Sequence, residues 1–366
     1  MSEIKKVIVL AGDGIGAEVM PVATELLALV AKERGEALDV IAMPIGVEPL
    51  LAEGRSLPDA TLRACLEADS VLLGALGDPR FDDQDPKERP EIALLALRKQ
   101  MGVYANLRPV QWIEALAKCS PLRPEIGRGS DMVVVRELGG GIYFGEPRGI
   151  DEAKKDARRA FNTMIYTEAE ITRIAKRAFE LASGRRKSLV SVDKANVLEA
   201  SRLWRTVVSE VAREFPEVQL RHAFVDAFAL ELACRPADLD VVLTANLFGD
   251  VLSDESAILH GGLGLLPSAS LGDGPGLFEP VHGSAPDIAG KDRANPIAMV
   301  LSMALMLHHG LGWTEEAERV ERAVHKTLES GARSADIAVG SDEVLGTREL
   351  GARINAAFLD SERVRS

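Results

Sequence analysis

Two aspartates four residues apart, Asp250 and Asp254, are residues whose type and spacing could do chemistry. The segment around them, residues 246–254, is expected to be helical, and residues at i and i+4 share one helix face. Two carboxylates held that close repel each other unless a cation lies between them. Mg²⁺ prefers oxygen ligands of this kind. The spacing therefore predicts a metal site, and a solvated acidic helix face is the alternative.

A second group of residues could hold an anion beside an alkyl group. Pro90 suits the first position of a helix that runs to about residue 99. One face of this helix would carry the residues at i, i+3, i+4 and i+7, which are Glu91, Leu94, Leu95 and Arg98. That face combines an acid, two leucines and an arginine. A core stripe flanked by charges is the alternative interpretation.

Two further arginines and a lysine stand at the ends of apolar runs. The planar guanidinium groups of Arg108 and Arg136 suit bidentate binding of carboxylates, although a single arginine is more often a surface ion pair. Together with Arg98 they suggest a cradle for a dicarboxylate. Lys194 stands just before a long helix. Near a bound cation a lysine loses its proton more readily and can serve as a general base, and an exposed structural lysine is the alternative.

The loop at residues 279–296 has the composition of a cofactor loop. Its glycines, serine and backbone amides can cradle phosphate, and Asp287 can accept hydrogen bonds from ribose hydroxyls. The same carboxylate would repel a 2′-phosphate, which favours NAD over NADP; a plain rigid loop is the alternative. Gly12, Gly14 and Ala17 match the relaxed fingerprint G-x-G-x-x-A, but no acidic residue ends an obvious second strand. We therefore interpret them as a tight strand-to-helix turn.

The elements that must position these residues alternate between short apolar runs and amphipathic stretches, which indicates an α/β fold. Strands are expected at residues 6–11, 71–74, 132–136, 188–192 and 241–245. The clearest helix follows Lys194, and we expect its apolar stripe to be core or subunit interface; its members are Ala200, Leu203, Trp204, Val207, Val208, Val211, Ala212 and Phe215. Residues 139–167, rich in glycine and with a charged middle, are expected to form a projecting arm or hairpin.

Length and composition limit the classes of protein. A chain of 366 residues suggests two domains, and a net charge of −13 argues against a nucleic-acid partner. The longest apolar run, residues 297–307, is too short to span a bilayer and is expected to be a buried helix, so no membrane partner is expected. Three scattered cysteines fit neither a disulfide framework nor a zinc motif, and no signal peptide precedes the first strand. A cytoplasmic location is therefore expected.

The chain resembles the β-decarboxylating dehydrogenase family, which includes isocitrate and isopropylmalate dehydrogenases. The resemblance covers nearly the whole chain in the motifs GDGIG, LRK, NLRP, VRELGGGIYFGEPRG, VDKANVL, NLFGDVLSDE, LPSASLG and EPVHGSAPDIAGK. It implies two α/β domains that share a large mixed sheet, with a projecting β-arm. One domain, on the cofactor side, would be discontinuous and comprise residues 1–103 plus 261–366. The other, residues 104–260, would carry the dimerisation and substrate/metal functions and the arm at about 139–167.

The resemblance also implies NAD, a divalent metal and the residues that hold them. Members of the family bind NAD without a glycine fingerprint. The implied cofactor contacts are Glu91, His282, Gly283, Ser284, Ala285, Pro286, Asp287, Ile288 and Asn295. Mg²⁺ or Mn²⁺ would be bound by Asp250 and Asp254 together with Asp226 of the partner subunit. Such a cation lowers the pKa of a bound hydroxyl group and stabilises an enolate.

The implied activity is the NAD-dependent oxidative decarboxylation of (2R,3S)-3-isopropylmalate to 4-methyl-2-oxopentanoate in leucine biosynthesis. The substrate carboxylates would be bound by Arg98, Arg108 and Arg136, with Asp226 also at the substrate. Lys194 of the partner subunit would take the hydroxyl proton, and Tyr143 would help to protonate the enol carbon. Leu94 and Leu95 would face the isopropyl group. Because Lys194 and Asp226 cross the interface in the family, a homodimer with shared active sites is implied.

Two departures from the family pattern and several alternative functions remain. Gly139 stands where the family usually has threonine, which is expected to loosen the arm near Tyr143, and the loop Gly-Ala-Leu-Gly-Asp-Pro at residues 74–79 replaces the commoner G-S-V-G-G-P. One alternative is a dehydrogenase for a related substrate, such as malate, a longer alkylmalate or tartrate. Another is a non-catalytic regulatory subunit of the same family. Phosphoryl transfer is disfavoured because the chain lacks the P-loop pattern GxxxxGK[ST].

Overall fold

The computed structural model describes residues 4–85, 88–151 and 158–363, and the chain divides into two compact units. Unit 1 comprises residues 1–103, 113–123 and 257–366, and unit 2 comprises residues 104–112 and 124–256. The first break along the chain falls after residue 103 and the last after residue 256, where the sequence prediction had residues 103 and 260. The segment 113–123 was expected in unit 2 but belongs to unit 1. It is held there by long-range contacts, such as the 2.6 Å hydrogen bond from Ser120 Oγ to the Ile258 carbonyl.

Five strands lie in the order β2-β1-β3-β12-β11 in the described part of unit 1. The first four run parallel and β11 is antiparallel to β12. The strands are β1 (Lys5–Gly12), β2 (Leu38–Ala42), β3 (Ser70–Ala75), β11 (Pro267–Leu271) and β12 (Gly276–Pro280). Every residue of β3, β11 and β12 is buried, as expected for strands covered on both faces.

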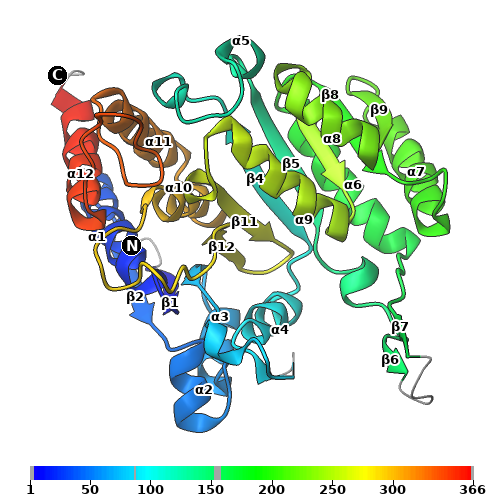
Figure 1. The fold of residues 1–366 in the computed structure, drawn as a ribbon, viewed down its shortest axis with the longest axis horizontal. Coiled ribbons are helices and arrows are strands. Elements are labelled where there is room, and N and C mark those ends of the chain that lie inside the picture. The colour runs from blue at the N-terminus through cyan, green and yellow to red at the C-terminus, as the bar shows by residue number, and fades with distance from the viewer. Residues whose placement is uncertain (1–3, 86–87, 152–157, 364–366) are drawn as a thin grey trace. The chain divides into compact units, whose positions relative to one another are not determined.

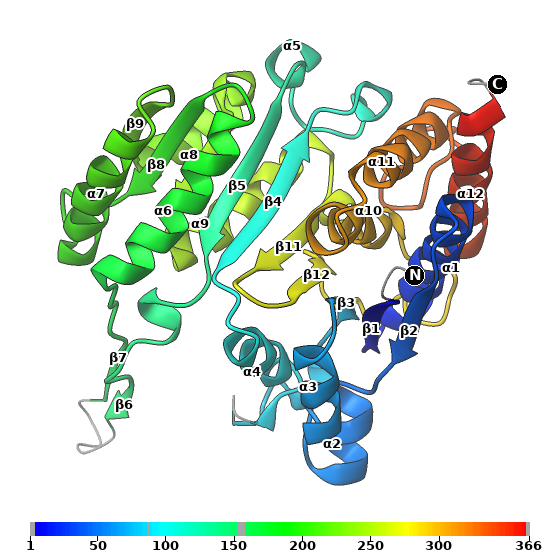
Figure 2. The same ribbon diagram turned by 180° about the vertical axis from the view of Figure 1, so that it is seen from behind.

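Helices α1, α10, α11 and α12 of unit 1 lie together in the views of Figures 1 and 2. The helices of unit 1 are α1 (Gly16–Arg34), α2 (Val47–Glu53), α3 (Asp59–Leu66), α4 (Ile92–Gln100), α10 (Ile297–Leu305), α11 (Thr314–Glu329) and α12 (Thr347–Arg363). Helix α10 is almost wholly buried and ends in a π-helical turn, Met306–Gly310, so the apolar run at 297–307 is core, as expected. No helix in the described part of the chain is long and apolar enough to cross a membrane.

In the described part of unit 2, five strands lie in the order β4-β5-β10-β8-β9, with β4 antiparallel and the others parallel, and two further strands form a separate hairpin. They are β4 (Ala105–Gln111), β5 (Asp131–Glu137), β8 (Ser188–Asp193), β9 (Gln219–Phe224) and β10 (Val241–Thr244). All five strands expected from the apolar runs are present, in the two units, as β1, β3, β5, β8 and β10. The expected α/β class with mixed strand directions is therefore confirmed.

Helices cover both faces of the unit 2 strands. Helices α8 and α9 lie in front of the strands in Figure 1, and α6 and α7 lie in front of them in the reverse view of Figure 2. The helices are α5 (Pro124–Gly127), α6 (Glu168–Ser183), α7 (Glu199–Val211), α8 (Val225–Cys234) and α9 (Asn246–Glu255). The stripe of α7 packs into the core through Trp204, Val207, Val208 and Val211. Leu203 was expected in that stripe but is exposed, because it lies about 100° around the helix from Trp204.

The expected arm contains a two-stranded antiparallel hairpin of β6 (Gly149–Asp151) and β7 (Arg159–Phe161). It extends away from the rest of unit 2 in both views. Residues 152–157 of the expected arm lie outside the described residues. The arm ends at Thr167, which caps α6 in a reciprocal capping box with Glu170.

Candidate active site

The two aspartates that opened the sequence argument lie on one face of α9. The side chain of Asp250 is 34% exposed and that of Asp254 is 50% exposed. Partial burial of the Asp254 carboxyl group raises its pKa above the usual value. Both side chains are therefore partly accessible to solvent. The geometry of the pair fits the expected spacing.

Arg108 and Arg136 meet these carboxylates because of the register between β4 and β5. Asn106 pairs with Arg136 across the ladder, and Arg108 follows two residues along β4, so all three side chains share one face. Arg108 Nη1 donates to Asp254 Oδ1 at 2.9 Å, and Arg136 Nη1 donates to Asp250 Oδ1. Both arginine side chains are almost fully buried, at 6% and 4% exposed. The interpretation of these two as surface ion pairs is therefore excluded.

Gly249 explains how α9 comes so close to Arg136. A β-carbon at this position would lie 2.2 Å from Thr244 Oγ1 and 2.7 Å from Arg136 Cγ. Any side chain there would push the helix away from β5 and separate Asp250 from the guanidinium group. Glycine is therefore required by the close approach, one residue before the first aspartate.

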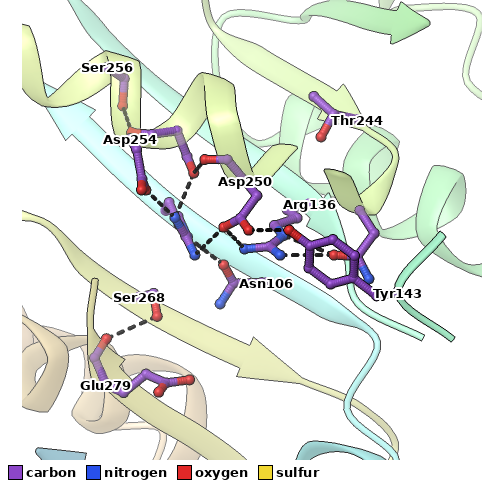
Figure 3. A network of polar contacts seen from close by, with 12 residues as sticks. Asn106, Arg136, Tyr143, Thr244, Asp250, Asp254, Ser256, Ser268 and Glu279 are labelled. Atoms are coloured by element: carbon purple, nitrogen blue, oxygen red, sulfur yellow. Dashed lines mark hydrogen bonds and ion pairs between the residues drawn. The ribbon is translucent and has the colours of Figure 1, made fainter. Parts of the chain in front are cut away.

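Tyr143 lies in a 3-10 turn, Gly141–Tyr143, and donates from its hydroxyl to Asp250 Oδ2 at 2.5 Å. Figure 3 shows the phenol and the Arg136 guanidinium meeting at this carboxylate. Burial, followed by the Asp250 hydrogen bond, raises the pKa of Tyr143 to about 12. The phenol is therefore protonated at neutral pH and can serve as a proton donor.

The turn that presents Tyr143 is shaped by Glu137, whose carboxylate is buried. It accepts the backbone N–H groups of Gly139 at 2.6 Å and Gly140 at 2.9 Å. Arg173 lies 3.6 Å from the same carboxylate, and its Nη2 atom would be 2.6 Å from a β-carbon at Gly139. The space left by the missing threonine side chain is thus filled by Arg173.

Lys194 and Asp226 are brought together by neighbouring strands. Lys194 follows β8 and Asp226 lies in the first turn of α8, after β9, and Lys194 Nζ donates to Asp226 Oδ1 at 2.5 Å. This contact lowers the pKa of Asp226. Within the described residues no group of three or more His, Cys, Asp or Glu side chains is placed to hold a metal ion. In the described chain, Asp250 and Asp254 therefore lie at one place and the Lys194–Asp226 pair at another.

In unit 1, Arg98 lies on α4 with Leu94 and Leu95, on a face that is only half-buried. The residues that α4 sends into the core are Ala93 and Leu97, so the leucines are not a core stripe. Arg98 Nη2 donates to Glu279 Oε1 at 2.7 Å, and both side chains are largely buried. The helix begins at Ile92, so Pro90 precedes it rather than occupying its first position. A short turn with i to i+3 hydrogen bonds, from Ile92 to Arg89 and from Ala93 to Pro90, leads into the helix.

Glu91 lies beside the loop at residues 74–79. Its carboxylate oxygen would be 2.5 Å from a β-carbon on Gly77, which has a positive φ of 121°. The Gly77 backbone N–H donates to Asp13 Oδ2 at 3.0 Å, and the Val47 N–H donates to the other oxygen of Asp13 at 2.8 Å. Burial raises the pKa of Asp13. Asp13 thus holds this loop in place next to Glu91.

The loop after β12 borders a cavity of about 310 Å³. Its lining residues are Ile15, Gly264, His282, Ile288, Arg293, Asn295, Ala335 and Asp336. His282 Nδ1 lies 2.9 Å from the Gly283 carbonyl, which can only accept, so Nδ1 carries the proton. Nε2 is buried and has no hydrogen-bond partner among the described residues. Burial lowers the pKa of His282, so Nε2 is a free acceptor at neutral pH.

The other expected cofactor residues continue along this loop. Asp287 and Gly283 are exposed, Ser284 is buried, and Ala285 has a positive φ of 38°. The Ser284 carbonyl accepts from the Ile15 N–H at 2.8 Å and would lie 2.0 Å from a β-carbon on Gly14. The glycine turn near the N-terminus is therefore packed against the chain's own loop, which supports its interpretation as a structural turn.

Several residues of the site were not found in the sequence. Asn246, at the start of α9, accepts from Arg136 and donates to the Gly140 carbonyl, which joins the arginine to the Tyr143 turn. Ser253 accepts from Arg108 at 2.6 Å. Asn246 and Ser253 lie within the acidic motif itself, so their place beside the two aspartates was a usable signal. Glu279 and Asp13 carried no such signal in the sequence, because their hydrogen-bond partners are distant along the chain.

Buried arginines beside carboxylates, a protonated phenol and a lysine–aspartate pair are the groups expected of an enzyme that acts on a polycarboxylic acid. The family description that matches residues 6–354 is isocitrate/isopropylmalate dehydrogenase. The chain belongs to this family. It is 51% identical over 348 residues to the 3-isopropylmalate dehydrogenase of Thermotoga maritima, covering 94% of this chain and 97% of that protein. It is also 51% identical to that of Gloeobacter violaceus, covering 96% and 98%.

Solved structures agree with the family. The isocitrate dehydrogenase from Methylococcus capsulatus is 32% identical, with a TM-score of 0.86, and the match covers 97% of this chain and 99% of that one. A beta-decarboxylating dehydrogenase from Thermococcus kodakarensis, in its apo form, is 34% identical with a TM-score of 0.80, and the match covers 98% and 97%. Each match therefore covers nearly all of both chains compared.

Proposed function

We propose that this enzyme oxidises 3-isopropylmalate with NAD and then decarboxylates it to 4-methyl-2-oxopentanoate, a step of leucine biosynthesis. The observation that carries the proposal is the roughly 50% identity, over nearly the whole chain, to proteins named for this activity. The half-buried face of α4 supports the choice of substrate. It sets Leu94 and Leu95 beside Arg98, so an alkyl group and a carboxylate could bind next to each other.

The arginines bind and orient the acid. Arg108 and Arg136 are already desolvated and held by neighbours, so little side-chain entropy is lost when a substrate carboxylate binds to them. Arg98 is held in the same way by Glu279. Three fixed guanidinium groups favour a doubly charged acid over a monocarboxylate.

Proton transfer is assigned to two residues. Lys194 of the partner subunit would take the proton of the substrate hydroxyl, and NAD, when bound, would accept the hydride from the same carbon. The bond to the 3-carboxylate then breaks, CO₂ leaves, and Tyr143 donates a proton to the enol carbon. The pKa of Tyr143, raised to about 12, keeps the phenol protonated throughout the neutral range, so its proton is present when the enol forms.

Asp250 and Asp254 would hold Mg²⁺ or Mn²⁺, together with Asp226 of the partner subunit. Their carboxylate oxygens are the hard ligands that these cations prefer, and both side chains are partly accessible. When bound, the cation supplies Lewis acidity that lowers the pKa of the substrate hydroxyl and stabilises the enolate.

NAD would bind in the cavity next to β12, whose lining residues fit its adenosine half. Its apolar lining with Ile288 and the unpartnered Nε2 of His282 suits the adenine ring. Asn295 lines the same cavity, and the exposed Asp287 can accept from ribose hydroxyls. Glu91 would lie toward the nicotinamide half.

A homodimer is part of the proposal because an apolar face lies on the helices that carry the metal ligands. Leu230 of α8 is 67% exposed and Val251 of α9 is 61% exposed. A second copy that covers this face would bring its own α8 toward Asp250 and Asp254. A cytoplasmic location is also proposed, and the three free cysteines support it.

The experiment that tests the function measures NAD reduction with malate, isopropylmalate, a longer alkylmalate, isocitrate and tartrate, each with Mg²⁺ and with EDTA. We expect isopropylmalate to give the highest kcat/KM and EDTA to abolish turnover. A kcat/KM for malate far above that for isopropylmalate would establish a different substrate. Lack of turnover with every acid would instead favour a regulatory subunit.

A further inference from the structure

The ends of β8 and β9 carry the Lys194–Asp226 pair in matched positions. Asp193 and Phe224 are the last residues of the two strands and are partners in the parallel register. Lys194 directly follows Asp193, and Asp226 follows Phe224 by two residues. The relative placement of the ammonium and carboxylate groups therefore depends on how these two strand ends are held together.

Arg205, on α7, contacts both strand ends with one guanidinium group. Its Nε donates to Asp193 Oδ2 and its Nη2 to Asp193 Oδ1, each at 2.8 Å. Its central carbon also lies 5.0 Å from the centre of the Phe224 ring. Figure 2 shows α7 next to β8 and β9.

The carboxylate of Asp193 transmits this contact to Lys194. Its side chain is only 1% exposed, and the nearest other basic group, His222 Nδ1, is 4.0 Å away. Asp193 Oδ1 also accepts the Ala195 N–H at 2.8 Å, so the carboxylate bridges the backbone on both sides of Lys194. A bidentate ion pair fixes the orientation of a carboxylate more tightly than a single bond does. Arg205 therefore orients the carboxylate that shapes the backbone at Lys194.

We propose that Arg205 is a positioning residue that keeps Lys194 and Asp226 aligned for proton transfer, acting through Asp193 on one strand and Phe224 on the other. The inference rests on the proposed function, in which Lys194 takes the substrate proton. Displacement of a reacting group by about 1 Å can cost on the order of 100-fold in rate. Loss of Arg205 should therefore lower kcat and leave the KM for NAD unchanged, because neither Asp193 nor Phe224 belongs to the cofactor loop.

The test compares Arg205→Met with Arg205→Lys and with Arg213→Met as the matched control. Arg213 lines the same cavity of about 440 Å³ as Arg205, but it contacts neither strand end. We expect Arg205→Met to lower kcat roughly 10- to 100-fold with the KM for NAD within about twofold of the original. Arg205→Lys should recover part of the loss, because an ammonium group keeps the charge but not the bidentate bond. Arg213→Met should match the unmodified enzyme.

Three results would overturn the inference: a kcat within twofold in a folded Arg205→Met dimer, an equal loss in Arg213→Met, or a rise in the KM for NAD that matches the fall in kcat. If Arg205→Met does not fold, Phe224→Leu removes only the ring contact and should still lower kcat about threefold or more. Crystal structures give a readout that needs no activity. In Arg205→Met, the distance from Lys194 Nζ to Asp226 Oδ1 should grow by about 1 Å. An unchanged distance refutes the positioning role even if the enzyme turns over no isopropylmalate.

Discussion

Replacing each aspartate of α9 separately should distinguish its structural contribution from its metal contribution. Asp250 accepts hydrogen bonds from Arg136 and from Tyr143, and its side chain is 34% exposed. A hydrogen bond to a charged group contributes about 1.5–3 kcal/mol when buried. Partial exposure and the remaining oxygen of asparagine reduce the loss, and relief of the repulsion with Asp254 offsets a few tenths of a kcal/mol. We expect Asp250→Asn to lower the free energy of unfolding by about 2 kcal/mol.

Asp254→Asn is the matched variant and should cost less. Asp254 accepts one hydrogen bond, from Arg108, and is 50% exposed. Arg108 keeps its bonds to Asn106 and Ser253 when Asp254 is changed. We therefore expect a loss below about 1 kcal/mol. At an unfolding entropy of about 2.1 cal/mol/K per residue, a chain of 366 residues loses roughly 1.3 °C of Tm per kcal/mol, so the Tm should fall by about 2–3 °C for Asp250→Asn and by about 1 °C or less for Asp254→Asn.

The assay is thermal unfolding in EDTA and in Mn²⁺, combined with turnover. A ligand at about 100 times its Kd adds about 2.7 kcal/mol of stability, so Mn²⁺ should raise the Tm of the unmodified enzyme. Both variants should lose this rise in Tm and the metal-dependent turnover equally, although their Tm values in EDTA differ. If Mn²⁺ still raises the Tm of both variants, the metal is not bound by the aspartates of α9. Equal losses in EDTA would show that the contacts of Asp250 do not stabilise the fold as reasoned here.

Three further predictions concern other parts of the site. Lys194→Ala should abolish turnover while light scattering still shows a dimer, and near-normal activity would remove Lys194 as the base. Asp287→Lys should lower the ratio of kcat/KM for NAD to that for NADP, because the carboxylate that repels a 2′-phosphate is gone; an unchanged ratio would take Asp287 out of the ribose site. Burial raises the pKa of Glu137 in the folded state. The folded protein therefore holds this proton more tightly than the unfolded one, and the contribution of Glu137 to stability falls as pH rises above about 4.5. Urea unfolding measured from about pH 4.5 upward should show the cost of Glu137→Gln shrinking as pH rises, and a constant or growing cost would contradict this.

The elements that could be predicted are those whose pattern is local. The five apolar runs became strands because burial on both faces leaves a continuous apolar signal, as in β3 and β10. The i, i+4 spacing of Asp250 and Asp254 was enough to place both on one helix face. Helix boundaries were less certain: α4 begins at Ile92 because an irregular turn, rather than Pro90, starts it.

What could not be predicted depends on contacts between distant segments. Glu279 is 181 residues from Arg98, and nothing in either local sequence identifies the other as a partner. The segment 113–123 joins unit 1 through hydrogen bonds to Ile258 and from Arg333, although strand β4 just before it belongs to unit 2. The Arg173 side chain at Gly139 is a third case. Glycine in place of the family's usual threonine at position 139 suggested a looser turn. In the structure, Arg173 fills the space and Glu137 holds the backbone of the turn.

The three arginines assigned to the substrate share one arrangement, and it bears on how the enzyme binds its ligands. Each is paired with a carboxylate of the protein: Arg98 with Glu279, Arg108 with Asp254 and Arg136 with Asp250. A substrate carboxylate therefore exchanges one anionic partner for another, and the arginines need no further desolvation. Two of these carboxylates are also the proposed metal ligands. In the proposed enzyme, a cation on Asp250 and Asp254 weakens their hold on Arg108 and Arg136, so cation and acid should each raise the affinity for the other.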